Sequence, residues 1–133
     1  MSFNLPQGFV DEMIAHALED APNECCGIIA GPDGRAEKLY RARNAEASPY
    51  RYKVDDKDLF RIYRETSDND WDFIAIYHSH TASEAYPSPT DVRLAFWPDA
   101  YYVLVSTKDP DSPVVRAYRI LDGEISEEEI VSD

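Results

Sequence analysis

His78 and His80, two residues apart, are the side chains of this sequence whose types and spacing most clearly point to chemistry. They follow an apolar run, residues 73–76, which is rich in β-branched and aromatic side chains and predicts a strand buried on both faces. Periodicity alone also fits a short buried helix, but we interpret the run as a central strand. Alternate residues of a strand share a face, so both imidazoles would point the same way at the strand's C-terminal end. Two imidazoles on one face favour a metal site.

Asp91 is the candidate for a third ligand. It follows a loop, residues 81–87, and closes the segment Ser88-Pro89-Thr90-Asp91, which opens a predicted apolar helix over residues 92–97. Two neutral imidazoles and a carboxylate suit zinc, and three protein ligands leave a fourth position for water, as in catalytic zinc sites. The Ser-x-x-Asp spacing with Pro second also predicts a helix capping box. Capping explains Ser88 and Asp91 alone, and the two interpretations can both be true.

The complete spacing resembles a known signature. His78-x-His80, seven residues, and then Ser88-x-x-Asp91, with Glu24 upstream, resembles the pattern of the JAMM (MPN-plus) zinc metallopeptidases. It is a constellation of five residues with fixed spacing, which makes it far more specific than His-x-His alone.

Further segments narrow the resemblance. Residues 22–27, Pro-Asn-Glu-Cys-Cys-Gly, are similar to the family's Pro-x-Glu-x-Cys-Gly stretch. Residues 80–88 and 102–107 are similar to the Mec group, whose members hydrolyse a cysteine adduct of a small sulfur-carrier protein. Thr81 departs from the pattern, because many JAMM peptidases have Pro there. The ligands are intact despite this departure, but the substrate of the broader family does not carry over directly.

The resemblance implies a fold and a set of site residues. The fold would be α/β, a mixed β-sheet flanked by helices in a single MPN/JAMM, cytidine-deaminase-like domain. One Zn²⁺ per chain would be held by His78, His80 and Asp91. Glu24 would act as the general base on the zinc water, and Ser88 would donate a hydrogen bond to the tetrahedral oxyanion.

The resemblance also implies a substrate. The enzyme would be a metallopeptidase that cleaves the amide between the C-terminal Gly of a small ubiquitin-like sulfur-carrier protein and cysteine, releasing cysteine for cysteine biosynthesis. A general isopeptidase that removes ubiquitin-like modifiers from lysine is the alternative. The short chain and the loop over residues 81–87 favour the cysteine adduct.

Two other classes of protein fit the sequence less well. A non-catalytic MPN scaffold would lack the motif, whereas all five residues are present here. A zinc deaminase would need two cysteines separated by two residues, whereas Cys25 and Cys26 are adjacent. In a strand, adjacent cysteines face opposite ways and cannot both bind one metal, so we expect two buried free thiols.

Composition limits the remaining possibilities. The 133 residues, 44% hydrophobic, fit one domain, which we place at residues 1–126, followed by an acidic, frayed tail at residues 127–133. The 26 acidic against 13 basic residues give a net charge of −13, which does not support nucleic-acid binding. Without a signal region or an apolar stretch near the roughly 20 residues of a membrane helix, we expect a cytoplasmic protein with no membrane partner. The oligomeric state is left open.

The elements that must position the site follow from local patterns. Apolar spacing predicts a first helix that Pro22 ends, and it places His16 on the polar, solvated side. Asp55 and Asp56 are expected to cap a second helix. The predicted strands cover residues 25–30, one strand on each side of a turn at residues 44–49, residues 101–107 and residues 114–120, with a hairpin turn at 121–124. Several connections are too short for parallel crossovers, which predicts a mixed sheet.

A basic stretch, residues 35–53, stands out in an acidic chain. It could dock an acidic protein partner, or it could be a solvated strand face. Its basic residues are Arg35, Lys38, Arg41, Arg43, Arg51 and Lys53.

Overall fold

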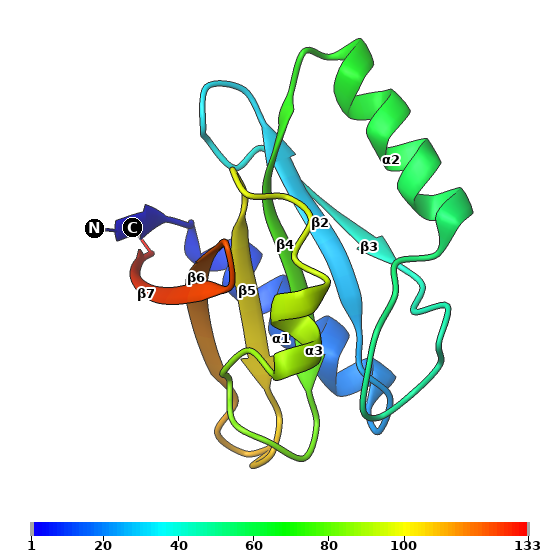
Figure 1. The fold of residues 1–133 in the computed structure, drawn as a ribbon, viewed down its shortest axis with the longest axis vertical. Helices are drawn as coiled ribbons and strands as arrows, with labels where there is room; N and C mark the ends of the chain where they lie inside the picture. Colours follow the sequence, from blue (N-terminus) through cyan, green and yellow to red (C-terminus); the bar gives the residue numbers. More distant parts are fainter. Residues whose placement is uncertain (1, 133) are drawn as a thin grey trace.

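The computed structural model describes residues 2–132, which form one seven-stranded sheet with helices on both faces (Figure 1). The strands are β1 (Ser2–Asn4), β2 (Cys26–Gly31), β3 (Lys38–Ala42), β4 (Asp72–His80), β5 (Tyr101–Ser106), β6 (Val114–Leu121) and β7 (Glu124–Val131). Their order in the sheet is β1-β7-β6-β5-β4-β2-β3. The pairs β4/β5 and β1/β7 are parallel and the other neighbours are antiparallel, so the predicted mixed sheet is confirmed.

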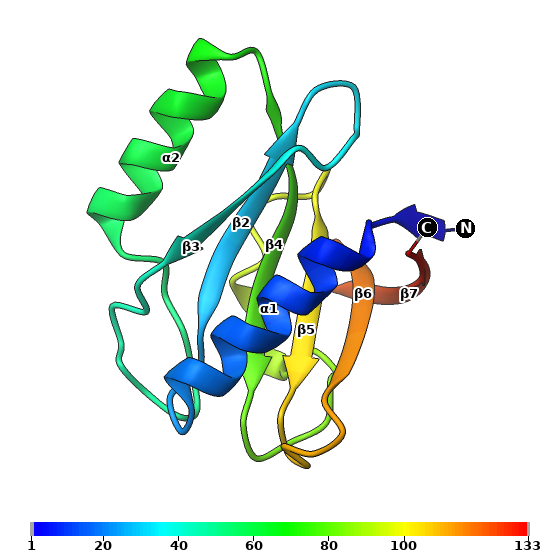
Figure 2. The ribbon, with the colours of Figure 1, turned by 180° about the vertical axis from the view of Figure 1, so that it is seen from behind.

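The three helices within residues 2–132 divide between the two faces of the sheet. Figure 2 shows α1 (Gln7–Asp20) lying across one face, while Figure 1 shows α2 (Asp56–Asp68) and α3 (Pro89–Arg93) on the other. Each face has its own buried core, and Cys25 belongs to the core under α1 whereas Cys26 belongs to the core under α2. Both cysteines are free and buried, as predicted. Among residues 2–132, no helix has both the length and the apolar character needed to cross a membrane.

Strand β4 is the buried centre of the sheet. All of its residues from Ile74 to His80 are buried, between antiparallel β2 and parallel β5. The register places His78 opposite Cys26 on one side and opposite Leu104 on the other. The strand is therefore rigidly paired up to its last residue, and it ends at the edge where β5 ends as well.

Three predicted elements differ from the structure. Residues 50–53 form no strand, and only an isolated bridge joins Asn44 to Val54. Helix α3 ends at Arg93 rather than continuing through residue 97, because the residue before Pro98 is disfavoured in a helix and the Trp97 backbone N–H donates instead to the Tyr102 hydroxyl (2.9 Å).

The predicted frayed tail is the third difference. Residues 127–131 belong to β7, in which residues 127–128 pair with β6 and residues 129–131 pair with β1. Pairing with one strand and then with the other fixes this segment despite its acidic composition. Asp133, the end of the predicted tail, lies outside the described residues.

The basic stretch is largely neutralised within the protein. Lys38 pairs with α2, Arg41 with two carboxylates of α1, and Arg43 with Asp55 and α2. Lys53 also approaches α2, with 3.9 Å between the charged atoms. These contacts favour the solvated strand face over a free docking surface.

Candidate functional site

The two histidines of β4 lie side by side, as predicted. Both side chains are buried on the α2/α3 face of the sheet, and their Nε2 atoms are 3.2 Å apart. Strand pairing on both sides of β4 fixes the backbone that carries them, so their separation does not depend on a flexible loop.

Asp91 reaches the histidines through the predicted capping box. The Ser88 hydroxyl accepts from the Asp91 backbone N–H (3.1 Å), and Asp91 Oδ2 accepts from the Ser88 N–H (2.9 Å). The same Oδ2 atom lies 3.2 Å from His78 Nε2 and 3.0 Å from His80 Nε2. Capping and convergence on the histidines thus occur together, because the cap turns the carboxylate toward β4.

The loop between β4 and α3 fixes the orientation of His80. Two hydrogen bonds hold the backbone of this loop. The Ser106 hydroxyl donates to the Ser83 carbonyl (2.6 Å), and the Tyr118 hydroxyl donates to the Ala85 carbonyl. Between these two anchors, the Glu84 carbonyl lies 2.9 Å from His80 Nδ1. A carbonyl only accepts, so Nδ1 carries the hydrogen and the neutral ring keeps its lone pair on Nε2.

The three converging atoms fit a metal ion. Burial alone would raise the pKa of Asp91, but its contacts with the two imidazoles outweigh burial and hold that pKa well below its usual value. Burial lowers the pKa of His78, which favours the neutral ring that a metal requires. The edges of the triangle measure 3.0 to 3.2 Å, against about 3.3 Å between ligands at 2.0–2.1 Å from a tetrahedral zinc ion. His78, His80 and Asp91 are thus placed to bind a metal.

Glu24 is a buried carboxylate beside this cluster. Its backbone is fixed on both sides, since its N–H donates to the Ser48 carbonyl (2.8 Å) and its carbonyl accepts from Asn44 Nδ2 (3.0 Å). The residue is 4% exposed, and Oε1 has no hydrogen-bond partner among residues 2–132. Burial, reinforced by the Asp91 charge and opposed by His80, raises the pKa of Glu24 to about 7. A carboxyl group with this pKa is suited to exchange protons at neutral pH.

His16 is the clearest error of the sequence analysis. It is 4% exposed rather than solvated, with its Nδ1 2.7 Å from the Tyr77 hydroxyl and its Nε2 3.2 Å from Asp20. It packs between α1 and the sheet, on the face opposite to Asp91. His16 follows the buried Met13 by three residues, so the helical spacing could have placed it on the inner side.

The contacts of two residues near the cluster were missed by the sequence analysis. Tyr52 stacks on His78, with ring centroids 4.2 Å apart and an angle of 20° between the ring planes. The Thr81 hydroxyl donates to the Pro22 carbonyl (3.0 Å), with the Pro49 carbonyl 3.4 Å away, and so joins the two loops that flank Glu24. No pattern within a single sequence indicates either contact, because both partners are distant along the chain.

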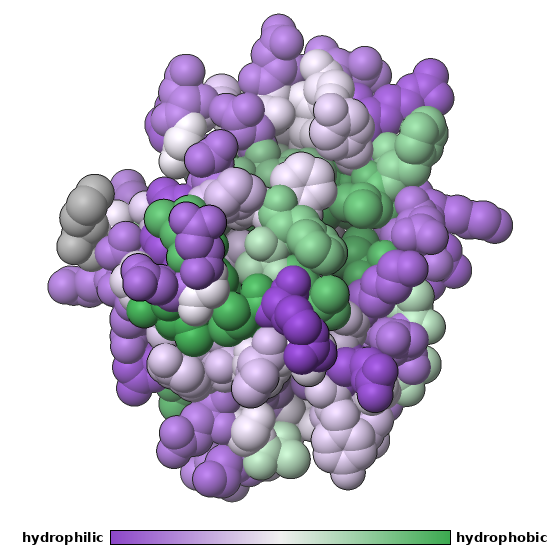
Figure 3. All heavy atoms as spheres, viewed as in Figure 1, coloured by the Kyte–Doolittle hydropathy of each residue, from purple (hydrophilic) through white to green (hydrophobic). Residues whose placement is uncertain are grey.

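An aromatic groove lies on the same face, away from the histidines. It has a volume of about 640 Å³ and is lined by the start of β4, by α2 and by the segment before β5, including Tyr63, Phe73 and Trp97. Figure 3 shows apolar surface gathered over the middle of this face, between α2 and α3. The groove contains no member of the His78 cluster, so it is separate from the candidate metal centre.

The chain is similar to known proteins over most of its length. The family described as prokaryotic homologs of the JAB domain matches residues 6–121. The chain is 50% identical over 123 residues to the CysO-cysteine peptidase of Mycobacterium tuberculosis, which covers 91% of this chain and 84% of that protein. It is 32% identical over 121 residues to a probable TtuB-protein conjugate cleaving protease of Thermus thermophilus, covering 90% and 77% of the two chains.

Solved structures agree with the observed architecture. A protein from Desulfitobacterium hafniense matches with a TM-score of 0.86 and 34% identity, covering 98% of this chain and 92% of that one. A JAB1/MPN domain protein from Archaeoglobus fulgidus, at 18% identity, shows the same fold with a TM-score of 0.63 over 98% of each chain. The predicted MPN/JAMM fold is confirmed, and this chain belongs to the family of prokaryotic homologs of the JAB domain.

Proposed function

We propose that this protein is a zinc-dependent hydrolase that releases cysteine from the C-terminal Gly of a small ubiquitin-like sulfur-carrier protein. One observation carries the proposal: three metal-binding atoms converge beside Glu24, a buried carboxylate with an unpartnered oxygen. The 50% identity to a CysO-cysteine peptidase supports the choice of substrate.

The metal is one Zn²⁺ per chain, held by His78, His80 and Asp91. Bound zinc acts as a Lewis acid and lowers the pKa of its water toward about 7. His78 and His80 contribute imidazole nitrogens. Burial lowers the pKa of His78 and favours its neutral ring, whereas the contact with Asp91 outweighs burial and raises the pKa of His80, so metal binding releases that proton. The ionised Asp91 balances part of the ion's charge. The His80 ring is already oriented for this role by its bond to the Glu84 carbonyl.

Glu24 and Ser88 perform the proton transfer and the charge stabilisation. Glu24 takes a proton from the attacking water and later gives it to the leaving amine of cysteine, so that its own protonation state is restored. The Ser88 hydroxyl oxygen accepts from the Asp91 N–H, which leaves its hydrogen free to donate to the oxyanion of the scissile carbonyl.

A second reaction uses the same chemistry. The alternative, removal of a ubiquitin-like modifier from a protein lysine, is supported by the 32% identity to a probable TtuB-protein conjugate cleaving protease. The two substrates differ only after the scissile bond, where one carries a single amino acid and the other a second protein. The higher identity to the CysO-cysteine peptidase favours cysteine as the leaving group. The two buried free cysteines are consistent with a reducing compartment, and we place the protein in the cytoplasm.

Metal analysis of the purified protein tests the ligand set. Wild type should contain one zinc per chain and His80→Ala much less, because two ligands hold zinc weakly. Chelation should abolish turnover while circular dichroism shows most of the fold retained, since the histidines sit on a strand paired on both sides. Equal zinc in both proteins, or gross unfolding on chelation, would contradict the assignment.

A comparison of two substrates tests which bond the enzyme prefers. Turnover is compared on one carrier protein that bears C-terminal cysteine and on the same carrier joined to a protein lysine. Active-site variants serve poorly here, because both reactions need the same residues. Faster cleavage of the cysteine adduct supports the proposal, and faster cleavage of the lysine conjugate favours the isopeptidase.

A further inference from the structure

The two histidines of the candidate metal centre are supported differently. A histidine that binds a metal through one ring nitrogen almost always donates from the other, and this bond fixes the ring orientation. His80 follows the rule, with Nδ1 bonded to the Glu84 carbonyl. His78 does not, because its Nδ1 is buried without a hydrogen-bond partner among residues 2–132. Something other than a hydrogen bond must fix the His78 ring.

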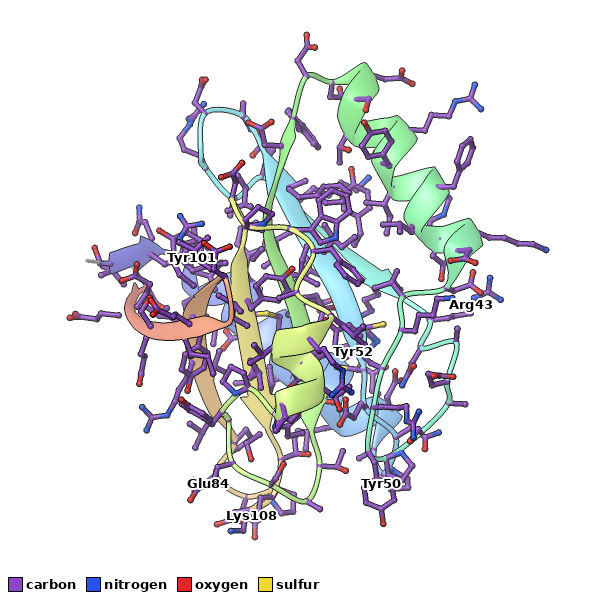
Figure 4. The ribbon with its side chains drawn as sticks, viewed as in Figure 1. Arg43, Tyr50, Tyr52, Glu84, Tyr101 and Lys108 are labelled. Carbon is purple, nitrogen blue, oxygen red and sulfur yellow. The ribbon has the colours of Figure 1, made fainter. Side chains whose placement is uncertain are left out.

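The ring of Tyr52 occupies the face of His78. The two rings are nearly parallel, at 20°, with centroids 4.2 Å apart, which is the geometry of an aromatic stack. Stacking restrains the tilt of the imidazole without using either of its nitrogens. Figure 4 shows Tyr52 directed inward beside α3, whereas Tyr50, from the same loop, points away from the protein.

Asn44 holds the backbone on both sides of Tyr52. Its Nδ2 donates to the Arg51 carbonyl and its Oδ1 accepts from the Lys53 N–H, both at 3.0 Å. The same Nδ2 donates to the Glu24 carbonyl at 3.0 Å. One side chain therefore places the stacking ring and the buried carboxylate in a common frame, although residues 50–53 form no strand.

We propose that Tyr52 is a positioning residue, which holds the His78 imidazole for metal binding by stacking in place of the missing hydrogen bond. The inference rests on the proposed zinc site. It requires the π-face of residue 52 and not its hydroxyl. A Phe at this position should therefore preserve the effect, and an aliphatic side chain should remove it.

Zinc affinity, measured by competition with a chromophoric chelator, tests this role separately from activity. Tyr52→Leu should bind zinc about 10- to 100-fold more weakly, the usual cost of losing a residue that orients a ligand. Tyr52→Phe should stay close to wild type. Tyr50→Leu is the matched control, since Tyr50 is 83% exposed in the same loop and should have no effect. Should Tyr52→Leu not fold, Tyr52→Met replaces it, because the unbranched, flexible Met side chain adapts to an irregular space and has no π-face.

The visible spectrum of the Co²⁺-substituted proteins gives a second measurement. The band positions and intensities report ligand geometry, so they should change in the aliphatic variant and not in Tyr52→Phe. Unchanged zinc affinity in the aliphatic variant, or an equal loss in Tyr52→Phe, would overturn the inference. A wild-type protein that binds no zinc would instead overturn the proposed function, so the two failures are distinguishable.

Discussion

The buried carboxyl group of Glu24 should make the stability of the metal-free protein depend on pH. Burial raises its pKa from 4.5 to about 7. Between these two pH values the unfolded chain releases the proton while the folded protein keeps it, so the folded state is progressively disfavoured as pH rises. The loss is complete above about pH 7. Glu24→Gln, which cannot ionise, should escape this loss.

The magnitude follows from the pKa difference. Each pKa unit corresponds to about 1.4 kcal/mol, so the full change is roughly 3 kcal/mol. Relaxation of the surrounding structure around a buried charge lowers the expected value to about 2 kcal/mol. At a typical urea dependence for a small domain, this moves the unfolding midpoint by about 1 M.

Urea unfolding of chelator-treated protein at about pH 5 and about pH 8 provides the assay. We expect the free energy of unfolding of Glu24→Gln, relative to that of wild type, to be about 2 kcal/mol higher at the higher pH than at the lower pH. Groups that do not interact with Glu24 cancel in this comparison, because they titrate alike in both proteins. Glu37→Gln, at an exposed position, is the control and should show a constant difference. A constant difference for Glu24→Gln as well would refute the argument that Glu24 is buried without a partner.

Three further outcomes are expected. Zinc-loaded Glu24→Gln should keep its metal but lose most turnover, because an amide cannot accept the proton; retained turnover would leave Glu24 a structural role only. Ser88→Ala should lower turnover by about 10²- to 10³-fold and stability by about 1 kcal/mol with zinc content unchanged, and normal kinetics would limit Ser88 to capping. Gly27→Ala should lose about 1–3 kcal/mol in thermal unfolding, because the new methyl group overlaps the buried Tyr77 ring. Gly8→Ala, with open space around it, should stabilise α1 slightly, and equal effects of the two changes would contradict the packing argument.

The candidate metal centre could be predicted from sequence because its determinants are local. A strand's two-residue period places His78 and His80 on one face, and a capping box places Asp91 at the start of α3. Only their meeting in space needed the structure. The link between Glu24 and this cluster came from the family resemblance, since β2 and β4 are neighbours only in the folded sheet.

Features that depend on distant partners could not be predicted. The acidic segment at residues 127–131 becomes ordered because β1, from the other end of the chain, completes its pairing. The Tyr52 ring lies against His78 because Asn44 holds a loop without regular structure. In each case the local sequence is compatible with a mobile segment, and contacts far along the chain decide otherwise.

Cysteine release is tested most directly by the intact mass of a sulfur-carrier protein with C-terminal cysteine after incubation with the zinc-loaded protein. The mass should fall by one cysteine residue, leaving a free glycine carboxylate, and His80→Ala should leave it unchanged. An unchanged mass with the wild-type protein, or an equal loss with His80→Ala, would contradict zinc-dependent release of cysteine.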